Sequence, residues 1–162
     1  MSKIYTKTGD KGNTGTFYGR ISKSDQLAGA LGAIDELNSA IGVCRHATSL
    51  DEELRRMQKN LLTIGSSLSG SGLKISGSET TNLEKLIDKL TKELPKLANF
   101  IYPIGQLHLA RAICRRAERE VVALEIKDKN ILKYLNRLSD ALFTLGRWTN
   151  FNMGVEEEVW KV

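Results

Sequence analysis

Residues 111–119, Arg-Ala-Ile-Cys-Arg-Arg-Ala-Glu-Arg, place four arginines and one glutamate in about two and a half turns of expected helix. The charged residues gather in one sector of this helix, and apolar residues occupy the other side: Ile113, Cys114, Ala117, Val121 and Leu124 lie opposite Arg111, Arg115, Glu118 and Arg119. Like charges four residues apart repel, so such a stripe usually needs an anionic partner, and guanidinium groups suit phosphate oxygens. The alternative is a solvated basic face interleaved with glutamates. The stretch therefore predicts an amphipathic helix with a candidate phosphate site.

The composition fits one soluble domain. A chain of 162 residues can bury a core of its own. The net charge of +5 favours anionic ligands, and the basic residues are spread along the chain rather than gathered in a tail. With two cysteines, two histidines and no metal-ligand spacing, we expect no metal site built by the protein. We expect a cytoplasmic protein without a membrane partner, since no apolar run is long enough and the N-terminus is not a signal peptide.

Four further segments carry the apolar spacing of a helix. They are expected from Asp25 past Ile41, from Ser49 to Leu68, from about Glu79 to Leu94 and from about Asn130 to Phe151, and the arginine helix is expected to reach about Ile126. The connections predict an all-α, five-helix, up-and-down bundle that forms a single domain over residues 1–162. Within it, residues 1–24 form a glycine- and threonine-rich loop with short strands at most, 25–151 form the bundle, and 152–162 form a C-terminal tail.

Two helix faces differ from the rest in residue type. Asn136, Asp140 and Arg147 share a narrow face of the last helix, which is either a solvated seam or one wall of a polar cleft facing the arginines. On the first helix, small residues surround one carboxylate on a face made by Ala28, Gly32, Asp35, Ser39 and Gly42. That face either packs closely within the chain or contacts another subunit, with Asp35 reaching an arginine of the neighbour.

The N-terminal loop has the composition of a phosphate cradle. In Thr6-Lys-Thr-Gly-Asp-Lys-Gly-Asn-Thr-Gly-Thr16, glycines free backbone N–H groups, threonines add hydroxyl donors and lysines add positive charge. The stretch is neither a Walker A loop nor a GxGxxG turn after a strand. A flexible N-terminus is the alternative.

Three segments together resemble the PduO-type ATP:cob(I)alamin adenosyltransferases: Ile4-Tyr-Thr-Lys-Thr-Gly-Asp-Lys-Gly12, the arginine stretch 111–119, and Tyr134-Leu-Asn-Arg-Leu-Ser-Asp140. The similarity extends through Asp35-Glu-Leu-Asn-Ser-Ala-Ile-Gly42 and covers nearly the whole chain in order. The resemblance implies a five-helix bundle that assembles as a homotrimer, with active sites between adjacent subunits.

The same resemblance implies the reaction. Cobalt(I) of cob(I)alamin attacks the 5′-carbon of ATP, which gives adenosylcobalamin and releases triphosphate. Clustered cations suit such a leaving group, and Mg²⁺ is expected on the ATP phosphates rather than on protein ligands. The implied partners are a flavin-dependent reductase and an adenosylcobalamin-dependent enzyme, with no nucleic acid.

The resemblance also assigns roles to residues of this chain. Arg115 is implied to stabilise the triphosphate, helped by Lys7 and Lys23. The full set matched to nucleotide binding is Thr6, Lys7, Thr8, Gly9, Thr14, Gly15, Lys23, Arg115, Arg116, Glu118, Arg119 and Asn136. Asp35 and Arg111 match a pair across the subunit interface. Phe100 matches an aromatic at the lower face of the corrin, although the loop from Pro103 to Arg111 is shorter here than in relatives.

Two other functions remain open at this point. A carrier or sensor of ATP and adenosylcobalamin would share the fold and lack turnover. A basic helical nucleic-acid-binding protein would use the same arginines, but glutamates are interleaved with them and aromatic residues make up only 6% of the chain.

Overall fold

The computed structural model describes residues 3–46 and 48–161, so residues 1, 2, 47 and 162 of the expected domain lie outside the described part. Its elements, in chain order, are β1 (Asn13–Thr16), β2 (Gly19–Ser22), α1 (Gln26–Cys44), α2 (Asp51–Leu68), α3 (Gly77–Thr91), α4 (Gln106–Val122) and α5 (Lys129–Asn152). The expected five helices are therefore confirmed within the described residues. The N-terminal segment adds a two-stranded antiparallel hairpin, in which Asn13 pairs with Ser22 and Thr16 with Gly19.

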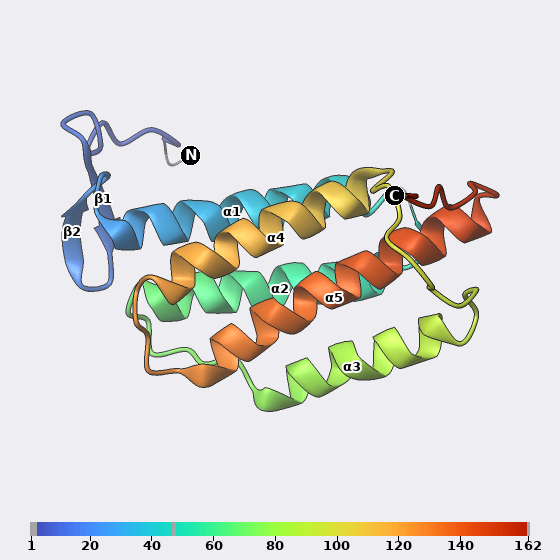
Figure 1. Cartoon of the computed structure of the whole chain (residues 1–162). Coiled ribbons are helices and arrows are strands. Elements are labelled where there is room, and N and C mark those ends of the chain that lie inside the picture. Colours follow the sequence, from blue (N-terminus) through green and yellow to red (C-terminus); the bar gives the residue numbers. More distant parts are fainter. Residues whose placement is uncertain (1–2, 47, 162) are drawn as a thin grey trace.

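Successive helices run up and down along one long axis (Figure 1). α1 packs on α2 and α4, and α5 packs on α4 and α3. Helix starts follow local capping, with the side chains of Asp25, Ser76 and Asp128 each accepting a bond from a backbone N–H two residues on. The expected start of α2 at Ser49 was wrong, because the N-cap is Leu50 and the acidic first turn Asp51–Glu53 stabilises the helix N-terminus instead.

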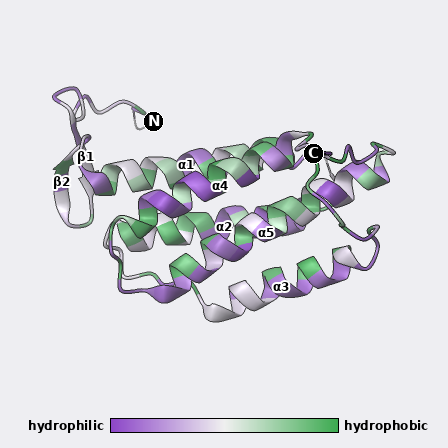
Figure 2. Cartoon of the chain, in the orientation of Figure 1, coloured by the Kyte–Doolittle hydropathy of each residue, from purple (hydrophilic) through white to green (hydrophobic). Residues whose placement is uncertain are grey.

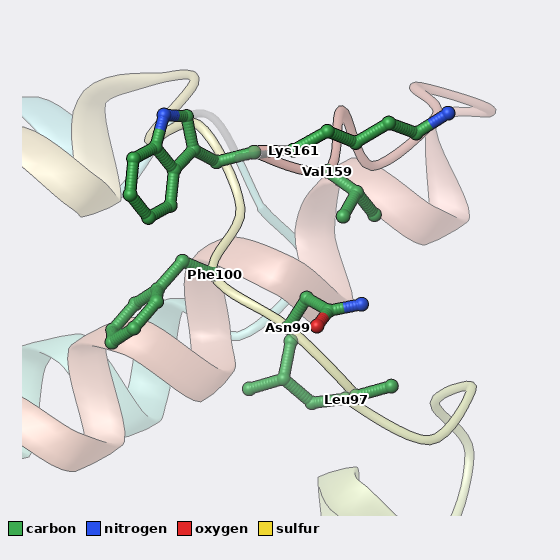
Figure 3. Close-up of a pocket in the computed structure, with 7 residues that line it drawn as sticks. Leu97, Asn99, Phe100, Val159 and Lys161 are labelled. Carbon is green, nitrogen blue, oxygen red and sulfur yellow. The ribbon is translucent and has the colours of Figure 1, made fainter.

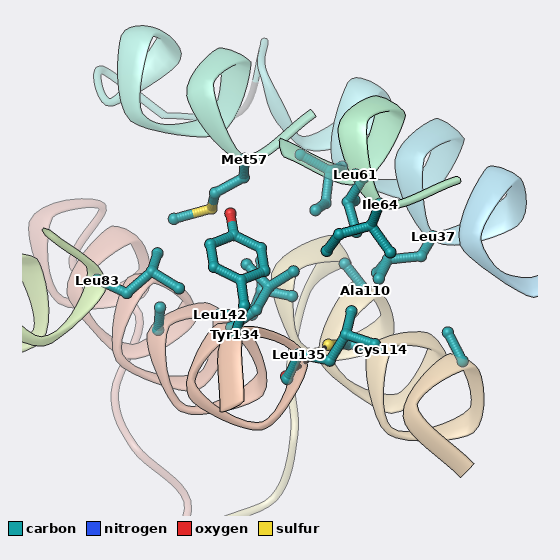
Figure 4. Close-up of a cluster of buried hydrophobic side chains, with 14 of the residues drawn as sticks. Leu37, Met57, Leu61, Ile64, Leu83, Ala110, Cys114, Tyr134, Leu135 and Leu142 are labelled. Atoms are coloured by element: carbon teal, nitrogen blue, oxygen red, sulfur yellow. Dashed lines mark hydrogen bonds between the residues drawn. The ribbon is translucent and has the colours of Figure 1, made fainter. Parts of the chain in front are cut away.

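The core lies between the helices and is mostly apolar, and it includes a buried hydrogen bond between Asn60 and Tyr134. Hydrophilic and hydrophobic residues alternate along the helices (Figure 2), and Leu37, Leu61, Leu135 and other aliphatic side chains meet inside (Figure 4). Cys44 and Cys114 are buried free thiols, as expected for small core residues. The buried Tyr134 hydroxyl accepts a bond from the Asn60 amide at 3.1 Å, so the one polar atom of that ring is satisfied.

The helix α1 is long and apolar enough to cross a membrane by length and composition alone. Its buried residues lie on one side, however: Ala30, Ile34, Leu37, Ile41 and Cys44. They face α2 and α4, on which the helix packs. This is the arrangement of a helix that packs one apolar side into a bundle core.

The hairpin is docked against the end of α2. The backbone N–H of Phe17, in its turn, donates to the carbonyl of Ser69 at 2.9 Å. The ring of Tyr18 lies over Gly70, where a β-carbon would stand only 2.7 Å from Cζ of that ring. Gly70 also has φ +98°, a conformation that favours glycine. A glycine at this point therefore lets the hairpin approach the bundle.

The C-terminal tail folds back on the linker between α3 and α4. Ile101 and Val159 form an isolated antiparallel bridge. Tyr102 N–H donates to Glu158 O at 2.9 Å, and Trp160 N–H donates to Phe100 O at 2.8 Å. The tail is thus paired with the linker that carries Phe100, which the sequence pattern did not predict.

Candidate functional site

The N-terminal loop closes on itself beside Lys23. Lys23 N–H donates to Gly12 O at 2.8 Å, and Gly12 N–H donates to Gly9 O at 3.1 Å. A β-carbon on Gly9 would lie 3.5 Å from Nζ of Lys23 and 3.3 Å from the carbonyl of Asn13. Gly9 therefore leaves room for the lysine ammonium. We call residues 6–12 together with Lys23 the N-terminal cradle.

Lys7 stands apart within the cradle because its backbone is left-handed. Its φ is +59°, a conformation uncommon for a residue with a side chain. Its ammonium lies 5.9 Å from the centroid of the Tyr5 ring. The hydroxyls of Thr6 and Thr8 are hydrogen-bonded to each other at 2.8 Å. The cradle thus holds three lysines and two threonines, all of them exposed.

Arg20 supports the cradle and was missed by sequence reasoning. Its guanidinium donates to the carbonyl of Thr8, and to that of Asn13 at 3.3 Å. These bonds fasten the loop to the hairpin. The one feature that could have indicated this role is the place of Arg20 in the hairpin, where it pairs with Gly15, next to Thr14.

Helix α4 presents its arginines to solvent in its second half. Arg115 and Arg119 are exposed, and within the described residues neither has a carboxylate oxygen within 4.0 Å. The Arg119 guanidinium donates to the Arg115 carbonyl at 3.0 Å. Glu118 accepts a bond from the side-chain amide of Asn136 on α5 at 3.2 Å. This surface, Arg115, Glu118, Arg119 and Asn136, is the α4–α5 polar face.

The other residues of the arginine stretch lie to either side of that face. Arg116 forms an ion pair with Glu36 of α1, a partner that the sequence pattern did not indicate. The guanidinium of Arg111 lies 5.3 Å from the centroid of the Phe143 ring, a cation–π geometry. Asp35 is exposed on α1 and makes no ion pair within the described part of the chain.

Arg147 does not belong to a polar seam with Asn136 and Asp140. Asn136 and Asp140 are exposed, and Asp140 pairs with Arg137 at 2.6 Å. Arg147 is only 5% exposed and binds Glu157 of the tail, with Nε 2.6 Å from Oε1. Asn136, Asp140 and Arg147 do lie on one side of α5, as the helical spacing predicts. The tail covers that side near the end of the helix, so Arg147 is buried and is not part of an exposed polar face.

Phe100 lies at the rim of an open hollow of about 910 Å³ between the linker and the tail. Figure 3 shows Leu97, Asn99 and Phe100 on the linker, with Val159 and Lys161 on the tail. Phe100 is 79% exposed, and its ring meets that of Trp160 edge to face with centroids 6.4 Å apart. An exposed aromatic beside a hollow suits the face of a large flat ligand better than a role in the core.

One chain does not bring all the predicted site residues together. The hairpin lies at the end of the bundle where α4 finishes, whereas the Phe100 linker lies at the opposite end (Figure 1). The amide of Gln26 donates to Ala123 O at 3.0 Å, which joins the start of α1 to the end of α4 near the hairpin. In the described part of the chain, no group of three or more His, Cys, Asp or Glu side chains could hold a metal ion.

The fold and these surfaces define a helical-bundle protein with a cationic N-terminal cradle, an arginine-bearing polar face and a separate aromatic hollow. The chain belongs to the cobalamin adenosyltransferase family, whose model matches residues 4–149. It is 44% identical to the corrinoid adenosyltransferase MMAB of Homo sapiens, over 99% of this chain and 74% of the relative. It is 41% identical to the corrinoid adenosyltransferase of Bacillus subtilis, over 94% of this chain and 89% of the relative.

Solved structures agree with this assignment. A variant of the PduO-type ATP:corrinoid adenosyltransferase from Lactobacillus reuteri, complexed with cobalamin and ATP, has a TM-score of 0.91 at 33% identity and covers 99% of this chain and 100% of its own. Another variant of the same protein, complexed with ATP, has the same TM-score and identity and covers 98% of this chain. The predicted family is confirmed, and the assignment favours an enzyme over a nucleic-acid-binding helical protein.

Proposed function

We propose that this chain transfers the 5′-deoxyadenosyl group of ATP to the cobalt of cob(I)alamin. The main support is the family match along residues 4–149, together with Arg115 and Arg119 of α4, which have no carboxylate within 4.0 Å in the described structure. In the reaction, cobalt(I) donates an electron pair to the 5′-carbon of ATP, and the carbon–oxygen bond breaks toward the phosphates. The products are adenosylcobalamin and triphosphate.

The residues of the N-terminal cradle and of the α4–α5 polar face both bind ATP in this proposal. Arg115 and Arg119 supply delocalised positive charge, and Arg115 stabilises the charge that develops on the departing triphosphate. Lys7 and Lys23 add point charges from the cradle. The other nucleotide contacts proposed are Thr6, Thr8, Gly9, Thr14, Gly15, Arg116, Glu118 and Asn136. Mg²⁺ is carried on the phosphates of ATP.

Phe100 is proposed to face the corrin ring. The ring is exposed and borders a hollow of about 910 Å³, so a large apolar surface can reach it. An aromatic at the lower face keeps an axial ligand from cobalt, which makes reduction to cobalt(I) easier. No acid–base residue is needed, because cobalt(I) loses no proton when it attacks carbon.

A homotrimer would complete the site. The cradle and Phe100 lie at opposite ends of one bundle (Figure 1), so a neighbouring subunit is needed to unite the nucleotide and corrinoid residues. Asp35 is exposed on a face of small residues, and Arg111 is half-buried on α4. We propose that these two residues pair across the interface.

The reaction also implies partner enzymes and a cellular compartment. A cytoplasmic, flavin-dependent reductase would supply the electron that makes cobalt(I), and an adenosylcobalamin-dependent enzyme would accept the product. The buried thiols Cys44 and Cys114 are compatible with a reducing compartment.

Anaerobic turnover of chemically reduced cobalamin with Mg-ATP tests the proposal. Loss of the cobalt(I) absorbance with stoichiometric triphosphate release would support the enzyme. Binding of ATP and adenosylcobalamin without turnover would support a carrier instead. Light scattering with Asp35→Ala tests the trimer, which should dissociate more readily than the unsubstituted protein.

A further inference from the structure

One guanidinium joins the linker that carries Phe100 to the C-terminal tail. Nε of Arg147 donates to Oε1 of Glu157 at 2.6 Å, and Nη2 donates to Oε2 at 3.2 Å. The same Nη2 donates to the carbonyl of Pro95 at 2.9 Å. Pro95 begins the linker, and Glu157 lies in the tail. Arg147 on α5 therefore fixes both segments to the bundle.

The two segments then hold each other at Phe100. The linker's far end is tied to α5 by the Asn150 amide, which donates to Ile104 O at 3.0 Å. Between these ends, Trp160 N–H donates to Phe100 O at 2.8 Å. The ring of Trp160 lies edge to face with that of Phe100 at an interplanar angle of 68°. Within the described structure, the direction of the Phe100 ring thus depends on the tail.

Besides its backbone bonds to the linker, the tail is held by partly exposed apolar side chains and by one ion pair. Val155, Val159 and Trp160 remain 36%, 40% and 48% exposed, so they are only partly buried against the bundle. The carboxylate of Glu157, by contrast, is largely buried against Arg147, with side-chain exposures of 22% and 6%. A buried bidentate pair is strong and directional when both partners are present, and removal of one partner leaves an uncompensated charge. The pair therefore ties the tail to α5 through side chains, in addition to the backbone bonds between the tail and the linker.

We propose that Arg147 is a positioning residue for the corrinoid half of the site, acting through Glu157 and the tail to hold Trp160 against Phe100. This inference rests on the proposed function, in which Phe100 faces the corrin. Arg147 touches neither substrate in this scheme. Its loss lowers corrinoid affinity because Phe100 and the tail must be ordered during binding.

The test replaces Glu157, which lies outside the helical core. Glu157→Gln keeps the size of the side chain and removes its charge, while Arg147→Lys keeps the charge and removes the fork. Arg56→Lys is the matched control, since Arg56 also makes a two-bond contact to a carboxylate, that of Glu79, without touching linker or tail. Equilibrium titration of cob(II)alamin in the presence of Mg-ATP measures corrinoid affinity without turnover.

The expected result is a roughly tenfold weaker corrinoid affinity in Glu157→Gln, a smaller loss in Arg147→Lys, and less than a twofold change in Arg56→Lys. ATP affinity should change less than twofold in all three variants. The chain has two tryptophans, so in a Trp148→Phe background all tryptophan fluorescence comes from Trp160. Replacement of Glu157 should shift this emission to the red, because Trp160 becomes more exposed to water. Thermal unfolding checks that the variants are folded.

Three outcomes would contradict the inference in different ways. Unchanged corrinoid affinity in Glu157→Gln would overturn the positioning role and leave the proposed function intact, whether or not Trp160 emission moves. No corrinoid binding by the unsubstituted chain would overturn the proposed function, and the positioning role with it. A parallel loss of corrinoid and ATP affinity would mark a general structural effect and also overturn it.

Discussion

The side-chain amide of Asn136 on α5 donates to the Glu118 carboxylate on α4 at 3.2 Å. Glu118 lies three residues after Arg115, a spacing at which glutamate and arginine attract each other on a helix surface. The bond to Asn136 draws the carboxylate toward α5. Arg115 is thereby left available for an external anion.

Removal of this amide should weaken nucleotide binding. In Asn136→Ala, Glu118 is free to turn toward Arg115 and compete with the triphosphate. We expect a roughly threefold to tenfold weaker Mg-ATP affinity, the size of one hydrogen bond. Isothermal titration checks this, with Asn130→Ala at the start of the same helix as the control. Equal ATP affinity in both variants would mean that Asn136 does not act on the site.

The contact between Tyr18 and Gly70 should control the order of the cradle. In Gly70→Ala the new methyl meets the Tyr18 ring, so the hairpin must shift. Gly72→Ala is a matched control, because Gly72 also has positive φ and a β-carbon placed there would have no atom within 4 Å. We expect faster proteolysis of residues 3–24 and several-fold weaker ATP binding in Gly70→Ala only. Equal behaviour of the two variants would show that backbone strain, not the Tyr18 contact, is responsible.

The cradle itself should become more ordered when ATP binds. Its glycines make ordering costly in conformational entropy, so phosphate contacts are needed to offset that cost. We expect Mg-ATP to slow proteolysis of residues 3–24, with little effect on cleavage at the tail. The same cleavage rate with and without ATP would be inconsistent with a cradle that binds phosphate.

The contact between Glu79 and Arg56 should make stability depend on pH in the acid range. Hydrogen bonds from Arg56 lower the pKa of the Glu79 carboxyl from its ordinary 4.5, and a bond from Asn60 adds to this. A lowered pKa in the folded state stabilises the fold above about pH 4.5, and this contribution is lost as pH falls through the folded-state value. Glu79→Gln should therefore lower the free energy of unfolding at pH 7 by roughly 1 kcal/mol, because Arg56 is half exposed.

Urea unfolding at pH 7 and below pH 4.5 measures the effect. The difference between Glu79→Gln and the unsubstituted protein should shrink as pH falls. Glu84→Gln is the control, since Glu84 also contacts an arginine, Arg137, at 3.2 Å, but its carboxylate is more exposed than that of Glu79. A pH-independent difference would show that the lost contact is not electrostatic.

The close approach of His108 to Gly146 should make that glycine necessary for packing. A β-carbon on Gly146 would lie 2.8 Å from Nε2 of the buried His108. We expect Gly146→Ala to lower the free energy of unfolding by roughly 1–3 kcal/mol, despite the better helix propensity of alanine. Gly65→Ala, where the nearest atom is 3.7 Å away, should be neutral or stabilising. The double variant with His108→Ala should recover part of the loss, and a fully additive result would contradict a direct clash.

The sequence predicts the helices and the local motifs well because both depend on spacing along the chain. The apolar period of α4 and the glycines of the cradle are visible without any tertiary information. The partners of Arg116 and Arg147 were not predictable, since Glu36 and Glu157 are brought to them by packing of distant segments. The tail pairs through backbone groups, which carry no residue signature, so the Trp160 contact with Phe100 was also missed.

The most direct test of the role of the α4 arginines in adenosyl transfer is anaerobic turnover of cob(I)alamin with Mg-ATP. The assay compares the unsubstituted chain with the variants Arg115→Ala and Arg137→Ala. Arg137 lies on α5 and already pairs with Glu84 and Asp140, so its variant controls for loss of charge. We predict turnover in the unsubstituted chain and in Arg137→Ala, and a loss of roughly a hundredfold or more in Arg115→Ala. Equal turnover in Arg115→Ala and the unsubstituted chain would contradict this role.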